Sequence, residues 1–340
     1  YNDSILTITE KSCADPYVIC DKGVYYMTFT ADGNRIEIWS SDSLFDLEHR
    51  ATKHVIWRPP PDTEYTSDIW APELHILHGR WYVYFAADHP LFGNMSHRMF
   101  VLRGPESTAS PLKAEDWDFA GPLAGMPEGQ WAIDGTVITL HGAMLFVYSG
   151  WPLGQSLSAS IQELFIIEMA DPVTCVGKPT RISTPEYQWE FSGKSGINEG
   201  PQFLASPDGR WCGIAYSCAG SWTSEYKMNV LEYKGGDPLA GNSWEKWRQP
   251  LLRASSDGEA PYGPGHGNFV LVDAPGGPEV WGVFHATDGR TGWAGRRARV
   301  MRVGWGDGGP YMGDGECGRC TGDVDHFLYG CKGDGCECGG

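Results

Sequence analysis

One acidic residue stands at a point of the chain where burial would change its chemistry. Glu199 lies between Asn198 and a Gly200–Pro201 step, directly before the apolar run Gln202–Leu204. Glycine and proline indicate an abrupt turn, and the apolar run indicates a strand entering a core. A carboxyl group at such an edge is ordered, and burial there raises its pKa toward that of a proton donor. The alternative is a turn acid exposed to water.

Four other short segments carry a polar or aromatic residue at a comparable place, and each precedes a run rich in aromatic side chains. The segments are Ala14–Ile19 with Asp15, Ile69–Leu74 with Trp70 and Glu73, Ala132–Val137 with Asp134, and Gly263–Phe269 with His266. The aromatic runs of the five units are Gly23–Phe29, Gly79–Phe85, Gly142–Tyr148, Gly209–Tyr216 and, more loosely, Glu279–Phe284. Such a repeat is typical of a β-propeller whose blades hold about four strands.

We therefore predict an all-β fold, a five-bladed β-propeller, in which the short polar segment is the innermost strand of each blade. The polar residues would then converge at one end of the central axis. Two or three carboxylates around one pocket are what cleavage of a glycosidic bond requires, since one acts on the anomeric side and another protonates the leaving oxygen. Aromatic side chains supply apolar faces for sugar rings. For any single residue, capping of a turn is an equally good explanation.

The composition limits the class of protein and of partner. The chain has 340 residues, of which 41% are hydrophobic, with 45 glycines and 23 prolines. This fits many short strands better than long helices. The formal net charge of −17 argues against nucleic acid and anionic membranes as partners, but not against a neutral sugar. No apolar run approaches the length of a membrane span. We expect a monomer.

Ten cysteines suit a secreted, oxidised protein with several disulfides. The glycosylation sequons Asn2-Asp3-Ser4 and Asn94-Met95-Ser96 point the same way. No signal peptide opens the chain, so we expect it to begin at a mature N-terminus after processing. Gly313–Gly340 is rich in glycine and cysteine, which favours a disulfide-stapled tail over a zinc site. The expected domains are a catalytic propeller, residues 1–312, and a Cys/Gly-rich tail, residues 313–340.

Two further stretches are candidates for the rim of a site. Asp88–Asp118 reads as a long loop, which forms either a binding rim or a solvated connector. Within Trp293–Trp305, strand alternation places Arg297 and Arg299 on one inward face. An inward arginine needs a carboxylate partner or an anionic or polyhydroxyl ligand. A structural ion pair explains it as well as a ligand does.

The motifs resemble those of glycoside hydrolase family 43, whose members are arabinofuranosidases, arabinanases and xylosidases on a five-bladed propeller. The resemblance extends over residues 1 to about 305. Each motif is weak alone, but the four occur in family order and at family-like spacing. They are Ala14-Asp15-Pro16, Trp70-Ala71-Pro72-Glu73, Ile133-Asp134-Gly135 and Asn198-Glu199-Gly200-Pro201.

The resemblance implies an inverting mechanism with three carboxyl groups. Asp15 would be the general base that activates water, Glu199 the general acid, and Asp134 the residue that holds the acid and tunes its pKa. Inverting enzymes keep the base and the acid about 6.5–9.5 Å apart, whereas retaining enzymes keep them about 5–5.5 Å apart. Glu199 must be mostly protonated at the working pH, so we expect burial and the like charge of Asp134 to raise its pKa.

The resemblance also implies residues that bind substrate or metal. Trp70 and Glu73 would bind the sugar, together with Arg297 or Arg299. His266 would lie near a water-bound Ca2+ or other cation on the axis, while the chemistry itself requires no cofactor.

Within the family, the exo-acting α-1,5-L-arabinofuranosidases are most similar, on the evidence of Ser183–Trp189, Gly263–His266 and Arg296–Arg299. The expected function is release of L-arabinofuranose from α-1,5-linked arabinan or arabino-oligosaccharides of the plant cell wall, arabinoxylan included. The alternatives are an endo-arabinanase, a β-xylosidase or another pentosidase of the family, and a non-catalytic sugar-binding propeller. The intact carboxylates argue against the last, because a pure binder has no use for a proton donor opposite a base.

Overall fold

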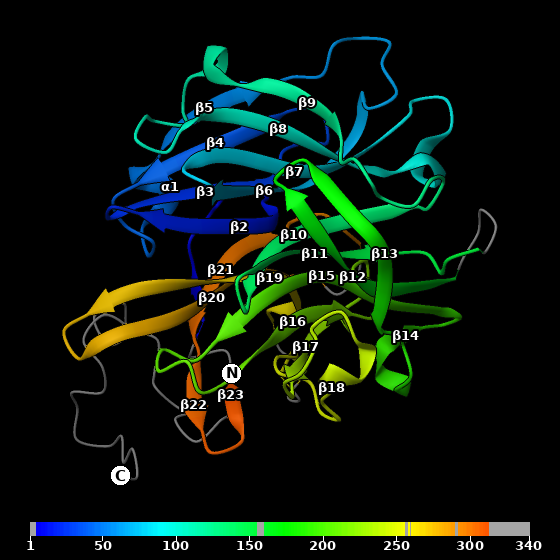
Figure 1. Ribbon diagram of the computed structural model, residues 1–340. Coiled ribbons are helices and arrows are strands. Elements are labelled where there is room, and N and C mark those ends of the chain that lie inside the picture. The colour runs from blue at the N-terminus through cyan, green and yellow to red at the C-terminus, as the bar shows by residue number, and fades with distance from the viewer. Residues whose placement is uncertain (1–4, 155–159, 256–257, 259, 290–291, 313–340) are drawn as a thin grey trace.

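The computed structural model describes residues 5–154, 160–255, 258, 260–289 and 292–312. Strands make up nearly all of the regular structure in these ranges (Figure 1), which confirms the predicted all-β chain. The helices there are short: α1 (Leu47–Arg50) and the 3-10 helices η2 (Gly93–Ser96), η3 (Ala114–Asp116), η4 (Gln188–Glu190) and η5 (Gly241–Ser243). None of these helices is long and apolar enough to cross a membrane.

The first two sheets each contain four antiparallel strands in chain order. The first sheet consists of β2 (Ala14–Asp21), β3 (Val24–Thr30), β4 (Ile36–Ser41) and β5 (Thr52–Trp57). The second consists of β6 (Ser67–Leu77), β7 (Arg80–Asp88), β8 (Arg98–Glu106) and β9 (Asp118–Pro122). The strand β8 lies inside the stretch predicted as one long loop, so that prediction is wrong over residues 98–106. Its apolar side chains pack into the core.

The middle of the chain forms a nine-stranded sheet from two antiparallel runs. The first run is β10 (Ala132–Leu140), β11 (Ala143–Gly150), β12 (Ile161–Asp171) and β13 (Thr174–Ser183). The second is β15 (Ser195–Ala205), β16 (Cys212–Cys218), β17 (Lys227–Tyr233) and β18 (Trp244–Lys246), with β14 (Phe191–Ser192) beside β15. A short parallel pairing of β12 with β15 joins the two runs.

The last sheet brings the two ends of the described chain together. It has the order β1-β21-β20-β19, so the first strand completes a sheet made from the end of the chain. Its strands are β1 (Leu6–Thr7), β19 (Tyr262–Ala274), β20 (Gly277–Thr287) and β21 (Arg297–Arg302), and a separate hairpin is formed by β22 (Gly304–Gly306) and β23 (Gly309–Tyr311). The five predicted aromatic runs correspond to β3, β7, β11, β16 and β20, the second strand of each four-strand run.

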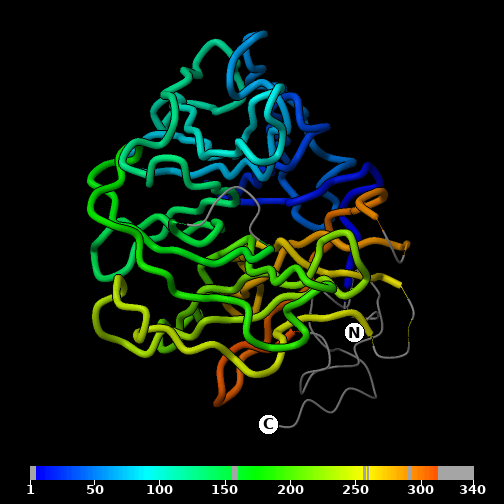
Figure 2. The backbone as a smooth tube through the Cα atoms, turned by 90° about the vertical axis from the view of Figure 1, so that its right-hand side faces the viewer, coloured from blue at the N-terminus to red at the C-terminus, as the bar shows by residue number. Residues whose placement is uncertain are grey.

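The first strands of these runs follow one another in space as they do in sequence. β2 contacts β6, β6 contacts β10, β10 contacts β15, β15 contacts β19, and β19 contacts β2. Figure 1 shows β2 beside the yellow and orange strands of the last sheet, and Figure 2 follows the same backbone after a turn of 90° about the vertical axis. Each first strand therefore contacts the first strand of the next run, and β19 contacts β2. Asp15, Asp134 and His266, near the N-terminal ends of three of these strands, lie close together.

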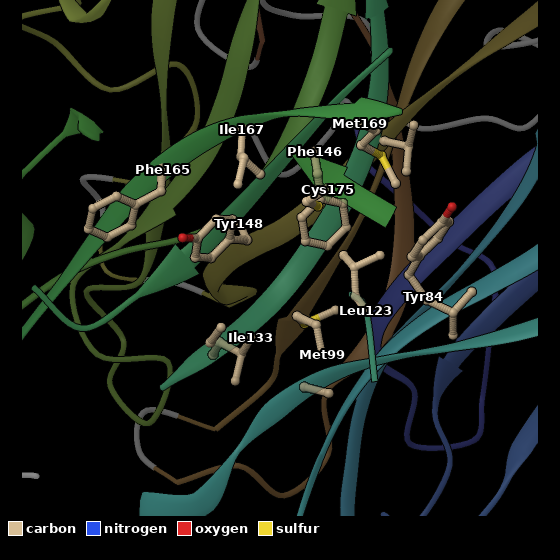
Figure 3. Packing of buried hydrophobic residues seen from close by; sticks show 14 of the residues in the cluster. Tyr84, Met99, Leu123, Ile133, Phe146, Tyr148, Phe165, Ile167, Met169 and Cys175 are labelled. Atoms are coloured by element: carbon tan, nitrogen blue, oxygen red, sulfur yellow. The ribbon is translucent and has the colours of Figure 1, made fainter. Parts of the chain in front are cut away.

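Apolar side chains from adjacent sheets fill the space between them. Figure 3 shows one such cluster, in which Tyr84 and Met99 from the second sheet meet Phe146, Tyr148 and Phe165 from the third run. These aromatic side chains are almost completely buried. Burial of large aromatic groups on both faces of each sheet is the main source of stability in such a layered arrangement.

The cysteines of the described ranges, residues 13, 20, 175, 212 and 218, are all free thiols. The predicted disulfides therefore have no support in this part of the chain. Cys212 and Cys218 stand at opposite ends of β16, and Cys13 lies just before β2 while Cys20 lies near the far end of that strand, whereas a disulfide needs Cα atoms within about 7 Å. The cysteines of the predicted tail, residues 313–340, lie outside the described residues, as does the sequon at Asn2.

Asn268 links the last sheet to the first. Its Oδ1 accepts a hydrogen bond from the backbone N–H of Val18 at 3.0 Å, and its Nδ2 donates to the Val18 carbonyl at 2.6 Å. The side chain of one strand thus satisfies both backbone groups of a residue in the neighbouring sheet. Asn268 is buried, so water cannot replace these bonds.

We expect Asn268→Ala to lower the free energy of unfolding by about 2–4 kcal/mol, because it leaves a buried N–H and a buried C=O without partners. Urea denaturation followed by tryptophan fluorescence measures the change. Asn242→Ala, at an exposed position in η5, is the matched control and should change stability by less than about 0.5 kcal/mol. Equal stabilities of the two variants would contradict this account of how the sheets are joined.

Candidate active site

A one-residue bulge recurs near the start of each first strand and positions the candidate residues. In each case the first strand advances three residues while its partner strand advances two. The bulged residue has a left-handed backbone with φ between 43° and 57°, and these residues are Asp15, Ala71, Asp134, Gly200 and His266. Four of them are not glycine, and this conformation costs such a residue about 1–2 kcal/mol. The surrounding structure must therefore hold it in place.

Side chains of the preceding four-strand run hold four of these bulges, with the last run preceding the first. The bulge N–H donates to an acceptor in every case: Asp15 to His285 Nδ1 at 3.1 Å, Ala71 to Thr30 Oγ1 at 2.9 Å, Gly200 to Asp134 Oδ2 at 3.1 Å, and His266 to Ser217 Oγ at 2.7 Å. The same bonds that join neighbouring sheets thus fix the backbone of the site. This explains how residues far apart in sequence share one rigid cluster.

Asp15 lies among cationic and ionisable groups. Its Oδ1 is 3.3 Å from His266 Nδ1, 3.5 Å from His285 Nδ1 and 3.6 Å from Arg296 Nη1, and its Oδ2 accepts a hydrogen bond from Thr30 Oγ1 at 2.6 Å. Burial by itself raises the pKa of Asp15, but these neighbours outweigh burial and lower the pKa below its ordinary value. The carboxylate is therefore ionised over the whole ordinary pH range.

Glu199 has the opposite electrostatic environment. Its side chain is buried, and the hydroxyl of Tyr226 donates a hydrogen bond to Oε1 at 2.8 Å. Burial raises the pKa of Glu199 to about 7, against the Tyr226 bond, and the negative charge of Asp15 adds to the increase. The raised pKa and its cause in burial agree with the prediction for Glu199, but the charge that adds to the rise is that of Asp15 and not, as predicted, that of Asp134. A carboxyl group with this pKa can donate a proton near neutral pH.

Asp134 is buried beside Glu199 and fixes the turn that follows it. Burial raises the pKa of Asp134 well above its usual range, and the charges of Glu199 and Asp15 add to this, although the Gly200 N–H bond opposes it. Two carboxyl groups that interact this closely titrate as a pair. The pair Asp134 and Glu199 therefore retains a proton at a pH where isolated carboxyl groups have lost theirs.

Trp70 stands directly before the second bulge and is only partly buried. Its ring stacks on that of His97, with 3.9 Å between ring centroids and an interplanar angle of 23°. His97 is itself fixed by its ring nitrogens, which lie 3.1 Å from the Asn94 carbonyl and 3.0 Å from the Asp68 carbonyl. The indole is thus a rigid, partly exposed apolar face.

Glu73 lies two residues beyond the bulge, in a buried network. Its Oε2 is 3.0 Å from His75 Nε2, its Oε1 accepts a hydrogen bond from Gln202 Nε2, and the His75 ring in turn meets the hydroxyl of Tyr17 at 3.4 Å. The charge of Glu73 also contributes to the raised pKa of Asp134. Both oxygens of Glu73 are therefore engaged by protein groups, and Glu73 is close enough to the carboxylate cluster to act on Asp134.

The arginine that reaches the cluster is Arg296. Arg297 is half-exposed and pairs with Asp288 at 3.4 Å, and Arg299 is buried against the same carboxylate at 2.8 Å. Arg296 precedes β21, in the loop that leads into it, and approaches Asp15. Strand alternation correctly placed Arg299 inside, but the prediction that Arg297 also faces inward is wrong, because Arg297 is the exposed first residue of β21. Alternation does not apply to Arg296, which lies before the strand.

His266 is brought to the cluster, as its position in the fifth segment predicted. Its Nδ1 faces Asp15 at 3.3 Å and Asp134 at 4.0 Å. Within the described ranges, no group of three or more His, Cys, Asp and Glu side chains is placed to hold a metal ion. Ca2+ prefers six to eight oxygen ligands, so these residues do not form a ligand set for it.

Sequence reasoning missed Arg296, His285 and Tyr226. His285 pairs across the strands with Gly265, as Thr30 does with Ala14, so an alignment of the second strands would have found it. Burial, aided by Arg296, lowers the pKa of His285 well below its usual range, and the neutral ring accepts the Asp15 N–H. Tyr226 has no comparable signal, because it lies just before β17, outside the repeated pattern.

Comparisons with known proteins agree with this geometry. The family model described as "Glycosyl hydrolases family 43" matches residues 7–310. The chain is 34% identical to an extracellular exo-α-(1→5)-L-arabinofuranosidase of Streptomyces chartreusis over 283 residues, which are 80% of this chain and 79% of that protein. It is 32% identical to a protein of the same name from Streptomyces avermitilis over 314 residues, which are 88% of this chain but only 61% of the relative.

Solved structures show the same relationship. The crystal structure of an α-L-arabinofuranosidase from Lactobacillus brevis superposes with a TM-score of 0.78 at 30% identity, covering 89% of this chain and 94% of that one. The carboxylate cluster, the family match across nearly all of the described chain and this structural likeness agree. The chain belongs to the glycosyl hydrolases of family 43.

Proposed function

We propose that this protein is an inverting, exo-acting glycoside hydrolase that releases L-arabinofuranose from α-1,5-linked arabinan and arabino-oligosaccharides. One observation carries the catalytic part of the proposal: the pKa of Asp15 is lowered while that of Glu199 is raised to about 7 within the same buried cluster. Two carboxyl groups whose pKa values are pushed apart are the pattern expected of a base and an acid. The arabinose specificity is supported by the names of the two Streptomyces relatives and of the Lactobacillus structure.

The proposed reaction uses Asp15 as the base and Glu199 as the acid. Asp15 accepts a proton from a water molecule whose oxygen forms a bond to the anomeric carbon. The bond from that carbon to the leaving oxygen breaks, and Glu199 donates its proton to that oxygen. Asp134 holds the backbone of Gly200 and so orients Glu199.

The residues around the carboxylates have proposed roles in binding and positioning. Trp70 offers its partly exposed indole face to the sugar ring. We propose that Arg296 has the sugar-binding role that the family resemblance implied for Arg297 or Arg299, because Arg296 is the arginine that lies next to Asp15. We propose that Glu73 acts on Asp134 from below through its charge, instead of contacting the substrate.

We propose that the five four-strand runs are the blades of a five-bladed β-propeller, with β1 completing the last blade beside β21. The contact of β19 with β2 supports closure of the ring.

We also propose that the protein is secreted and works as a monomer on plant cell-wall polysaccharide. The word "extracellular" in the names of both Streptomyces relatives supports secretion, and the sequon at Asn94 lies on an exposed 3-10 helix.

We also propose a cation beside His266, as the family resemblance implies. His266 would be its one ligand from the carboxylate-facing cluster, and water would have to supply the others. We derive no catalytic step through such an ion. Metal analysis of the purified protein tests it, since one bound Ca2+ per chain that is lost in His266→Ala supports the site and a metal-free active protein contradicts it.

Incubation with linear α-1,5-arabinan should release free arabinose with inverted anomeric configuration, as followed by NMR. Glu199→Gln and Asp15→Asn should each lower kcat by about 10²–10⁴-fold, the usual contribution of an acid or base. Arg297→Gln, a change at a half-exposed ion pair, is the control and should leave kcat within about twofold. Short oligosaccharides as products would indicate endo action, and unchanged kcat in Glu199→Gln would exclude it as the acid.

The value of kcat/KM should fall as the pH rises through about 7, because Glu199 loses its proton there. On the acid side kcat/KM should be retained below pH 4, because the pKa of Asp15 is lowered and its carboxylate stays ionised. The Tyr226 hydroxyl stabilises ionised Glu199. Removing it in Tyr226→Phe should therefore raise the pKa of Glu199 and move the alkaline limb up by about one pH unit.

Tyr233→Phe is the matched control, since its hydroxyl bonds to the Gly236 carbonyl at the surface, and its alkaline limb should not move. An alkaline limb that moves down in Tyr226→Phe, or does not move, would contradict the assigned role of the hydroxyl.

A further inference from the structure

Two exposed tryptophans lie on the loops that supply Tyr226 and Arg296. Trp222 is in the loop between β16 and β17, and Trp293 is in the loop between β20 and β21. Their side chains are 38% and 57% exposed. Neither belongs to a hydrophobic cluster of the core, so their packing does not explain why large apolar groups stand there.

The two indoles form one ordered unit across neighbouring sheets. Their ring centroids are 6.1 Å apart with an interplanar angle of 74°. Trp293 Nε1 donates to Ser221 Oγ at 3.1 Å, and the N–H of Gly292 donates to the Trp222 carbonyl at 2.9 Å. The loops are thus joined by both side-chain and backbone hydrogen bonds, and the two ring faces are held at a fixed angle in water.

The position of this pair relative to the catalytic groups follows from the loops that carry it. Both loops leave their sheets at the end where Glu199 pairs with Ser217 and where Gly265 pairs with His285. The Trp222 loop ends at Tyr226, which donates to Glu199. On the other loop, Arg296 donates to the Trp293 carbonyl at 3.3 Å and approaches Asp15. Each tryptophan therefore lies on a loop that also carries a residue in contact with a catalytic carboxyl group.

The tryptophan pair borders the side of the site on which the acid Glu199 lies, because the Trp222 loop ends at Tyr226. Glu199 protonates the leaving oxygen in the proposed reaction, so the leaving part of the substrate begins at Glu199. Tyr226, in contact with Glu199, marks the same side. In exo cleavage the leaving part is the whole remaining chain, and this chain must pass along a wall of the site. A wall with exposed indole faces binds the apolar faces of sugar rings.

We propose that Trp222 and Trp293 form a binding site for the leaving-group chain of the substrate, a neutral pentose oligosaccharide, beyond the bond that is cleaved. This inference rests on the proposed function. Sugars that lie beyond the first leaving unit then gain binding free energy from the indoles, so affinity increases with the length of the substrate. The preference for longer substrates is then a property of these two loops and not of the carboxylate cluster.

The test compares kcat/KM for α-1,5-linked arabinobiose, arabinotriose and arabinopentaose in the wild type and in the Trp222→Ala/Trp293→Ala double variant. We expect the double variant to lose little on the dimer and about tenfold on the pentamer, because only the longer substrate has sugar rings that reach the indole faces. The loss should appear in KM, with kcat preserved. Leu271→Ala, an exposed apolar residue toward the other end of β19, should show no dependence on length.

A second set of measurements separates binding from folding. Trp222→Phe and Trp293→Phe retain an aromatic face and should recover most of the affinity for the pentamer. Calorimetric titration of arabinopentaose into Glu199→Gln, with and without the two alanine substitutions, should give about a tenfold difference in Kd. Equal losses on all chain lengths, or no loss on any, would overturn the inference while wild-type arabinose release stands. Failure of the proposed function would instead show as no arabinose release by the wild type from any length.

Discussion

The one-residue bulge in each first strand is the constraint on which the site depends. The bulge gives Asp15, Asp134 and His266 a left-handed backbone, and this turns their side chains out of the regular alternation of a strand. Aspartate tolerates that conformation better than most residues, which is one reason why the acidic groups stand there. Glu199 stands one position earlier, before Gly200, and the bulge of its own strand is held by Asp134.

The bulges would not persist without the polar side chains of the adjacent sheets. Thr30, Ser217 and His285 each lie opposite the residue before the bulge in their own sheet, and each binds the bulge N–H of the next sheet. Because these groups are buried, loss of a bond leaves a donor without a partner, at a cost of about 1–3 kcal/mol. Apolar packing between sheets provides most of the stability, but it is non-directional. The polar links are what fix the sheets in one arrangement.

The same links create the electrostatic contrast within the cluster. Burial acts on all three carboxyl groups in the same direction, so it cannot by itself separate a base from an acid. The separation comes from what surrounds each group. Asp15 has His266, Arg296 and a hydroxyl beside it, whereas for Glu199 burial and the negative charge of Asp15 outweigh the Tyr226 hydroxyl and the more weakly acting Arg296. A base and an acid therefore arise from chemically similar side chains a short distance apart.

The sequence by itself determined the β class, the five repeated units and the residues Asp15, Asp134, Glu199 and His266, because turn residues and strand periodicity are local signals. Only the tertiary structure decided that Arg296 and not Arg297 reaches Asp15, that Glu73 is tied to Gln202 and His75, and that the described cysteines are unpaired. It also revealed His285, which binds Asp15 across 270 residues of sequence. These outcomes depend on contacts between sheets, and local patterns specify which face of a strand is buried but not which neighbour it meets.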